Sequence, residues 1–309
     1  MAGTYGKYDE RVVDYELYIL EPPIIDPVTK APLELRGPRP SSFEPGHYFV
    51  CIGGAQTFGR FCIKPFPLLL QESIDLPALN LGRGGAGPSF FSPTNEVLLA
   101  YVRGARFAVL QVMSGRSAGN SLFRSEGLGS YVRRSDGIYV GADEAFANLL
   151  RERSRKEVQQ IVAETREEWM ESFRALLKAI DVPRILLWFS IRPPAYRDGY
   201  DSVSTLFRDF PQLVNEKMIR ALMPYCDHYV SCVSSRGLPH LLNDRITGEP
   251  VVVQDEWGGE WSVNSYYPSP EMHLDAARRL EPVARRCAIG EGKEKSWARR
   301  VLGKYSCRR

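Results

Sequence analysis

Short apolar runs alternate with longer amphipathic segments along most of the chain. The apolar runs are strand-length and rich in β-branched and aromatic residues, at 47–53, 77–82, 106–113, 184–190 and 227–233, with a weaker sixth at 249–254. Helical patterns fall between them, at about 56–73, 94–103, 155–181, 211–223 and 270–286. Continuous apolar strands separated by helices are typical of a parallel sheet buried on both faces. The pattern therefore predicts an α/β fold: a flavodoxin-like three-layer α/β/α sandwich around a central, mostly parallel sheet of five or six strands.

The two ends of the chain depart from this alternation. Residues 1–45 are rich in proline and polar groups, and each proline removes a backbone donor and disfavours helix, so we predict an extended arm laid over the domain. Residues 46–287 form the predicted α/β domain. Residues 288–309 form a basic tail, interpreted as a solvated end, with a contact to an anionic partner as the alternative.

Composition narrows the class of protein. The 309 residues are 44% hydrophobic and 25% charged, as in an ordinary globular protein. A formal charge of +3 does not by itself indicate nucleic acid or a membrane surface, and neither is expected as a partner. The six cysteines show no metal-ligand spacing, and the chain shows no apolar signal core. We expect a cytoplasmic protein without metal or cofactor; its oligomeric state stays open.

Glycine-rich and polar segments follow the predicted strands. They read GGAQTFG (53–59), NLGRGGAGP (80–88), SGRSAGNS (114–121) and SIRPPAYRDGY (190–200), and VNSYYPSPEMH (263–273) precedes the last helix. Ligands of open parallel sheets bind beyond the carboxyl ends of the strands. We therefore expect these segments to meet at one edge of the sheet.

In this order the segments resemble the SGNH (GDSL-type) hydrolases, whose blocks read GDSxTxG, NxGxxG, GxND and DxxH. The matching positions are Gly53 and 56–59, then Asn80, Gly82 and Gly85, then loosely Gly115 and Asn120, and finally His273. More closely, GAQTFG, NLGRGGAGP and NSYYPSPEMH together resemble an uncharacterised bacterial family that sometimes accompanies sulfotransferase domains. That closer resemblance covers nearly the whole chain.

The chain departs from the SGNH pattern at the catalytic positions. Gly54 and Ala55 stand where the family has Asp and the nucleophilic Ser, and Pro270 stands where it has the Asp that orients the histidine. Acyl-enzyme chemistry needs an oxygen or sulfur nucleophile beside a base. A Ser-type esterase mechanism is therefore not expected.

The remaining polar residues suggest other chemistry. The candidate catalytic set is His273 as general base, with Gln56, Gly85 and Asn120 steadying developing charge. The candidate binding set is Arg83, Arg116, Arg192 and Thr57, because guanidiniums from three post-strand loops would cradle sulfate, phosphate or carboxylate. The plainer alternatives are that each arginine pairs with an acidic neighbour and that Thr57 caps a helix. The aromatics Trp257, Trp261, Tyr266 and Tyr267 would suit sugar stacking or form a core edge.

Three functional hypotheses follow. The first is a transferase or hydrolase that acts on an anionic or glycan substrate without a protein nucleophile. The alternatives are a catalytically inactive module that binds a sulfated or phosphorylated ligand, and a scaffold protein. Whether the chain is an enzyme stays open, since one fold hosts many activities.

Overall fold

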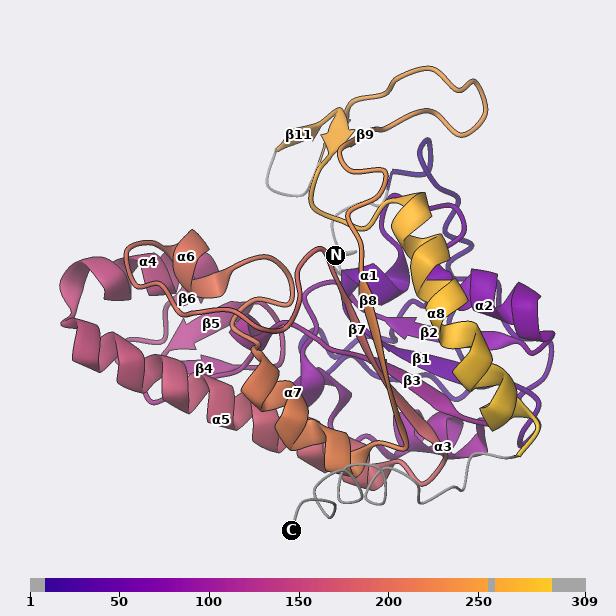
Figure 1. Ribbon diagram of the computed structural model, residues 1–309, viewed down its shortest axis with the longest axis horizontal. Helices are drawn as coiled ribbons and strands as arrows, with labels where there is room; N and C mark the ends of the chain where they lie inside the picture. The colour runs from indigo at the N-terminus through magenta and orange to yellow at the C-terminus, as the bar shows by residue number, and fades with distance from the viewer. Residues whose placement is uncertain (1–8, 255–258, 291–309) are drawn as a thin grey trace, which may run out of the picture.

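Five parallel strands form one sheet, in the order β2-β1-β3-β7-β8 (Figure 1). The computed structural model describes residues 9–254 and 259–290. The strands are β1 (Phe49–Gly53), β2 (Ala78–Gly82), β3 (Ala108–Gln111), β7 (Arg184–Ser190) and β8 (His228–Val233). Each coincides with a predicted apolar run, which confirms the predicted fold class. The sixth run does not join this sheet: β10 (Val253–Gln254) pairs antiparallel with β11 (Glu260–Trp261) instead.

Helices cover both faces of the sheet, as the sandwich requires. One face carries α3 (Glu96–Gly104), the second half of α5 (Arg155–Ala179) and α7 (Glu216–Leu222), while α2 (Phe66–Ile74) and α8 (Pro270–Ala288) pack on the other. Strand β1 shows why its sequence is apolar throughout. Val50 and Ile52 belong to the first core, and Phe49 and Cys51 belong to the second. Successive side chains of a strand point to opposite faces, so both sets must be apolar.

Two predicted helices differ from those observed. The segment 56–73 forms two helices, α1 (Ala55–Phe58) and α2, because Gly59 ends α1 in the left-handed conformation (φ 80°) and Pro65 precedes α2. The segment 211–223 becomes helical only at α7, whose N-terminus is capped by the Asn215 side chain. It is followed by the 3-10 turn η3 (Met223–Tyr225). The other three predicted helices correspond to α3, α5 and α8.

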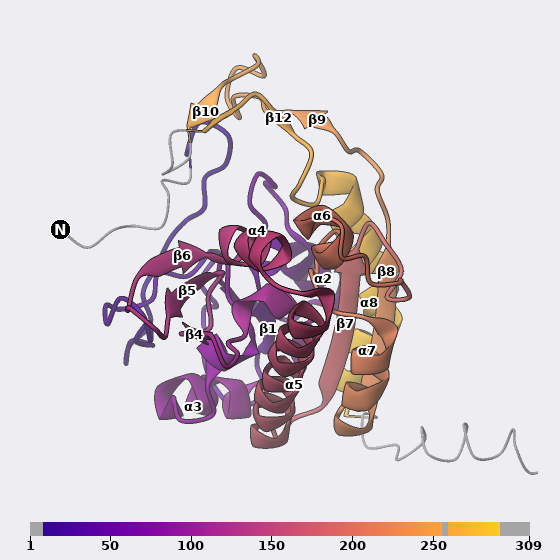
Figure 2. The ribbon, with the colours of Figure 1, turned by 90° about the vertical axis from the view of Figure 1, so that its left-hand side faces the viewer.

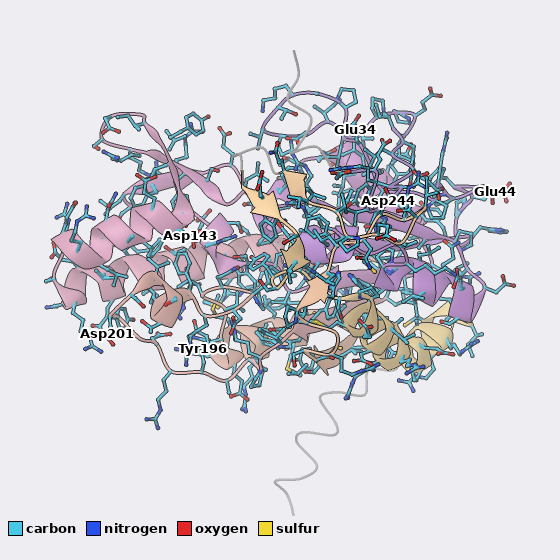
Figure 3. All side chains as sticks on the ribbon, turned by 90° about the horizontal axis from the view of Figure 1, so that it is seen from above. Glu34, Glu44, Asp143, Tyr196, Asp201 and Asp244 are labelled. Carbon is cyan, nitrogen blue, oxygen red and sulfur yellow. The ribbon has the colours of Figure 1, made fainter. Side chains whose placement is uncertain are left out.

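A second lobe, which sequence analysis did not predict, lies beside the sheet (Figure 1). Its antiparallel sheet contains β4 (Phe123–Ser125), β5 (Ser130–Arg133) and β6 (Tyr139–Gly141), covered by α4 (Ala142–Glu152) and α6 (Val203–Phe207). Helix α5 joins the two parts. Its Val162 belongs to the lobe core and its Trp169 to the core of the main sheet. Figure 3 shows Asp143 and Asp201 on this lobe, away from Asp244.

Residues 9–45 form no helix or ladder strand in the structure. They make only isolated bridges, Tyr18 with Leu35 and Ile25 with Pro32, and Arg36 bridges to Asn80 of the edge strand β2. The arm segment therefore lies along this edge. The predicted basic tail lies outside the described residues from 291 onward. Among the helices within the described ranges, none has the length and apolar character needed to cross a membrane.

Short paired strands stand beyond the carboxyl ends of the central strands (Figures 1 and 2). Here β9 (His240–Leu241) pairs with β12 (Val263–Asn264), next to the β10–β11 pair. Val12, Val13 and Tyr15 of the arm pack with this region and with Phe58 of α1 in a separate small core. The arm and the hairpins thus border the turn between β1 and α1, which we call the crest (residues 53–57).

Candidate functional site

The crest fits tightly on the sheet because two strands end in glycine. A Cβ atom on Gly53 would lie 2.2 Å from Oγ1 of Thr57 and 2.5 Å from Oε1 of Gln111. A Cβ atom on Gly82 would lie 2.2 Å from the backbone nitrogen of Phe58. Contacts this short are impossible, so any larger residue would push α1 off the strands. Packing alone therefore requires these two glycines of the SGNH-like blocks.

Thr57 helps to fix the crest and does not face a ligand. Its hydroxyl donates to Oε1 of Gln111 at 2.6 Å, and the same oxygen accepts the Gly54 N–H at 3.2 Å. The Asn80 amide donates to the Thr57 carbonyl at 3.0 Å. Thr57 is fully buried, and the N-cap residue of α1 is Gly54. Thr57 is therefore too buried for the predicted ligand contact, and it does not cap the helix.

His273 lies inside the core on the α2/α8 face of the sheet. Its ring packs on Phe66 and Phe189, at centroid distances of 6.2 and 5.3 Å, and its Nδ1 accepts the Phe66 N–H at 3.1 Å. The proton of the neutral imidazole is therefore on Nε2. Burial, assisted by the charge of Arg36, lowers the pKa of His273 to about 3. An enclosed imidazole of such low basicity does not fit the predicted role of general base.

Two of the three predicted binding arginines are buried and bind other groups of the protein itself. Arg83 forms a buried ion pair with Asp26 of the arm at 2.9 Å. Arg192 donates to the carbonyl oxygens of residues 193, 209, 211 and 214, and burial lowers its pKa to about 10. Arg116 differs, because 26% of its side chain stays exposed while it pairs with Asp143 of the lobe at 2.7 Å. The predicted cradle of three arginines does not form.

Two further residues of the predicted catalytic set, Asn120 and Gly85, lie in different parts of the structure. Asn120 lies at the base of the lobe, where its Oδ1 accepts the N–H groups of Leu122 and Phe123 and its amide donates to Thr165. These bonds use the oxygen and one of the two N–H groups of the amide to hold the lobe together. Gly85 does lie in the loop after β2, with a left-handed φ of 73° that suits glycine. A Cβ there would be 3.7 Å from the Gly129 nitrogen.

Gln56 lies in the crest itself, with its side chain folded inward. It is only 3% exposed, and its Oε1 lies 3.1 Å from the position of a Cβ atom on Gly54. The side-chain amide therefore folds back over the crest. Among the described residues, it has no hydrogen-bond partner. The amide is not among the side-chain groups of the described residues that are both fully enclosed and unpaired, so it remains accessible to a ligand.

A series of contacts leads from the crest to the loop that carries Arg116. We call its members, together with Gln56, the crest rim: Ala55, Gln56, Arg60, Arg116, Gln212, Tyr266 and Tyr267. The backbone N–H of Arg60 donates to the Ala55 carbonyl at 3.3 Å, and its side chain donates to the Tyr267 hydroxyl at 3.0 Å. The rings of Tyr267 and Tyr266 meet edge to face at 4.9 Å. The Tyr266 hydroxyl accepts from the side-chain amide of Gln212 at 2.9 Å, and the backbone carbonyl of Gln212 accepts the N–H of Gly115, next to Arg116, at 2.8 Å.

Asn264 holds the two rim tyrosines in place. Its side-chain oxygen accepts the N–H groups of Tyr266 and Tyr267, at 3.2 and 2.9 Å, and its amide donates to the Tyr267 carbonyl at 2.8 Å. Burial raises the pKa of the Tyr267 phenol, and the charges of Arg60 and Arg116 oppose that rise. Both guanidiniums therefore act on the same phenol.

The sequence singled out some rim residues and missed others. Tyr266 and Tyr267 were noted as possible sugar-stacking residues, and Trp261 packs against Tyr267 at 6.1 Å. Trp257 lies outside the described residues. No sequence motif marks Arg60 or Gln212, because each contacts the rim tyrosines across a long sequence separation. In the described part of the chain, no group of His, Cys, Asp or Glu side chains could hold a metal ion.

The rim offers groups for binding and lacks one for covalent chemistry. Arg116 supplies a partly exposed cation, and Gln56 supplies both a donor and an acceptor. Tyr266 is 39% exposed, so its ring can pack on a ligand. Ala55 stands at the nucleophile position of the resemblance and contributes no reactive atom.

Comparisons with solved structures give distant similarities. The lipase Lip_vut3 from a goat rumen metagenome is 11% identical, with a TM-score of 0.41 over 77% of this chain and 97% of that chain. A lipolytic protein assigned to the G-D-S-L family, from Desulfitobacterium hafniense, is 12% identical, with a TM-score of 0.35 over 77% and 99%. A carbohydrate esterase family 2 enzyme from Corynascus thermopiles is 14% identical, with a TM-score of 0.38 over 84% and 71%. Similarities this low say nothing about activity.

Comparison of the sequence with known proteins and families identifies the family. No curated protein matches the chain. One family does match, over residues 28–127 and 145–288, and it is described as a domain of unknown function, DUF6473. The interruption at 128–144 covers β5 and β6 of the lobe, whereas the crest and the central strands all lie within the match. The chain therefore belongs to the DUF6473 family.

Proposed function

We propose that the protein binds a small anionic or glycan ligand at the crest rim without forming a covalent intermediate. The observation that carries this proposal is the Gln56 amide, which folds over the crest, makes no hydrogen bond within the described residues and is not fully enclosed. A ligand that offers both an acceptor and a donor would pair with this amide, and each such hydrogen bond contributes about 0.5–1.5 kcal/mol.

The surrounding groups suit such a ligand. Arg116 would pair with a sulfate, phosphate or carboxylate group, and the exposed ring of Tyr266 would pack on a sugar face. The alternative of an enzyme with His273 as general base has lost its support, because that imidazole is enclosed and its pKa is about 3. With Ala55 at the crest, recognition without turnover is the function that the geometry favours.

Calorimetric titration with glucose 6-sulfate, glucose 6-phosphate and glucose tests the proposal. We expect at least one of the two anionic sugars to bind more tightly than glucose. Gln56→Leu should weaken that binding by about tenfold or more, which corresponds to about 1.4 kcal/mol. It should leave the melting temperature nearly unchanged, because the Gln56 amide makes no hydrogen bond within the described residues that the substitution would break.

The matched control is Gln159→Leu, which makes the same chemical change at an exposed position of α5. It should leave the affinity unchanged. The proposal is rejected if no sugar of the panel binds the wild-type protein, or if Gln56→Leu binds as tightly as the wild type. A drop in melting temperature with unchanged affinity would assign Gln56 a purely structural role.

A further inference from the structure

A hollow of about 570 Å³ opens at the carboxyl end of the edge strand β8, beside the first turns of α8. It shares no residue with the crest rim. The lining residues come from the ends of β7 and β8, the loop after β8, and one face of α8: Ile191, Cys232–Arg236, Asp275, Arg278 and Arg279. Both places lie at the edge of the sheet where open α/β folds bind ligands.

The charge in this hollow is unbalanced. Three guanidiniums, those of Arg236, Arg278 and Arg279, line it together with a single carboxylate, that of Asp275. Asp275 pairs with Arg236. Arg278 and Arg279 are exposed, and within the described ranges no carboxylate lies within salt-bridge distance of either. Like charges held together repel one another, so an anion bound among them would stabilise the arrangement.

The loop that carries Arg236 is fixed against α8. Asp275 accepts the Ser234 hydroxyl at 2.7 Å, and the Ser269 hydroxyl donates to the Arg236 carbonyl at 2.5 Å. A Cβ atom on Gly237, whose φ of 74° is left-handed, would lie 2.0 Å from a carboxylate oxygen of Glu271. The backbone of Arg236 is therefore held in place before any ligand arrives.

Arg279 reaches toward the end of β8 as well. Burial raises the pKa of the Cys232 thiol to about 11, the charge of Asp275 adds to this rise, and the charge of Arg279 opposes it. Arginines from the helix and from the loop thus act on the same region. Converging guanidiniums match the several acceptor oxygens of a tetrahedral anion better than they match a single carboxylate.

We infer that this hollow binds a phosphate or sulfate group through Arg236, Arg278 and Arg279, as a second anion site separate from the crest rim. The excess of two positive charges among the lining residues matches a dianion. The site depends on no residue of the proposed function, so either can fail alone.

The test is calorimetric titration with sodium sulfate, compared with sodium chloride at equal ionic strength. It uses the Gln56→Leu/Arg116→Ala variant, so that the crest rim does not contribute. We expect saturable sulfate binding that chloride does not reproduce. Arg278→Gln and Arg279→Gln, introduced separately, should each weaken it by about tenfold. Arg286→Gln makes the same change farther along α8 and should have no effect.

Three results would overturn the inference: no sulfate binding in the Gln56→Leu/Arg116→Ala variant, undiminished binding in Arg278→Gln and Arg279→Gln, or equal weakening by Arg286→Gln. The last would show that sulfate responds only to the overall charge of the helix. A parallel titration with phenyl phosphate and inorganic phosphate identifies the source of the group. Tighter binding of the ester would indicate a phosphorylated organic molecule, and tighter binding of the free ion would indicate an inorganic ligand.

Discussion

Gln56 and Gly54 form a matched pair at the crest, with Oε1 of Gln56 lying 3.1 Å from the position of a Cβ atom on Gly54. Gly54 has φ −84° and ψ −158°, a conformation open to any residue. Glycine is therefore not needed at this position for its backbone freedom. Its missing side chain leaves the space into which the Gln56 amide folds, where the SGNH block carries an Asp.

Gly54→Ala tests this pairing. The new methyl group would press on the end of a flexible side chain, so the amide should swing away from the crest. We expect weaker binding of the anionic sugar and a change of less than about 1 kcal/mol in the free energy of unfolding. A double-mutant cycle with Gln56→Leu checks the cause, because both substitutions should act through one amide. Fully additive losses of affinity would contradict the pairing.

Ala55→Ser introduces a hydroxyl at the position that the SGNH resemblance assigns to the nucleophile, yet we expect no esterase activity. A serine needs a base within hydrogen-bond reach, and the Nδ1 of His273 already accepts the Phe66 N–H inside the core. Hydrolysis of p-nitrophenyl acetate should stay at the rate of the wild-type protein. A rate that rises in Ala55→Ser and falls again in Ala55→Ser/His273→Gln would show that the imidazole can reach the crest after all.

The sheet could be predicted from the sequence because each of its strands is a continuous apolar run of a few residues. A strand buried on both faces must be apolar at every position, so the run RILLWFS at 184–190 predicted β7 to the residue. The lobe was missed for the opposite reason. Its strands are three or four residues long and expose polar positions, as in Phe123–Ser125, so no period is established.

The site was harder to predict because partners distant in sequence decide it. Arg83 looked available in its own loop, but its acceptor, Asp26, belongs to the arm 57 residues earlier. His273 kept the position of the family's histidine, yet the Phe66 backbone and two aromatic rings enclose it. Gln56, which lies within the crest, stays a predicted site residue. Its folded-back amide shows only in three dimensions.

Arg36 anchors the N-terminal arm, and its loss should be severe. The guanidinium is 2% exposed and donates to the carbonyl oxygens of Phe58, Gly59, Cys62 and Ile63, at 2.7 to 3.2 Å. Arg36→Met would leave these buried acceptors without their donor. We expect a loss of about 3–5 kcal/mol in the free energy of unfolding, measured by chemical denaturation.

Arg39→Met is the matched control, since Arg39 lies in the same arm and its side chain is exposed. It should change the free energy of unfolding by less than about 0.5 kcal/mol. Equal effects of the two substitutions would mean that the Arg36 carbonyl contacts do not hold the arm.

The buried imidazole of His273 should make stability depend on pH. Its pKa is about 3 in the folded protein, against about 6.5 in an unfolded chain. Between these values the unfolded state binds one more proton, so the free energy of unfolding falls as pH drops below about 6.5 and is unaffected by this group above it. For His273 alone, the loss between pH 7.5 and pH 5.5 is about 1.4 kcal/mol.

His273→Gln keeps a side-chain oxygen that can accept the Phe66 N–H, and it removes the titrating group. Chemical denaturation at pH 7.5 and pH 5.5 should therefore show a smaller pH effect in His273→Gln than in the wild-type protein, by about 1.4 kcal/mol. His47→Gln serves as the control, because 64% of that side chain is exposed to solvent in the folded protein. It should retain the wild-type pH dependence. If His273→Gln retains it as well, the imidazole of His273 is protonated in the folded protein at pH 5.5, and its case as a general base reopens.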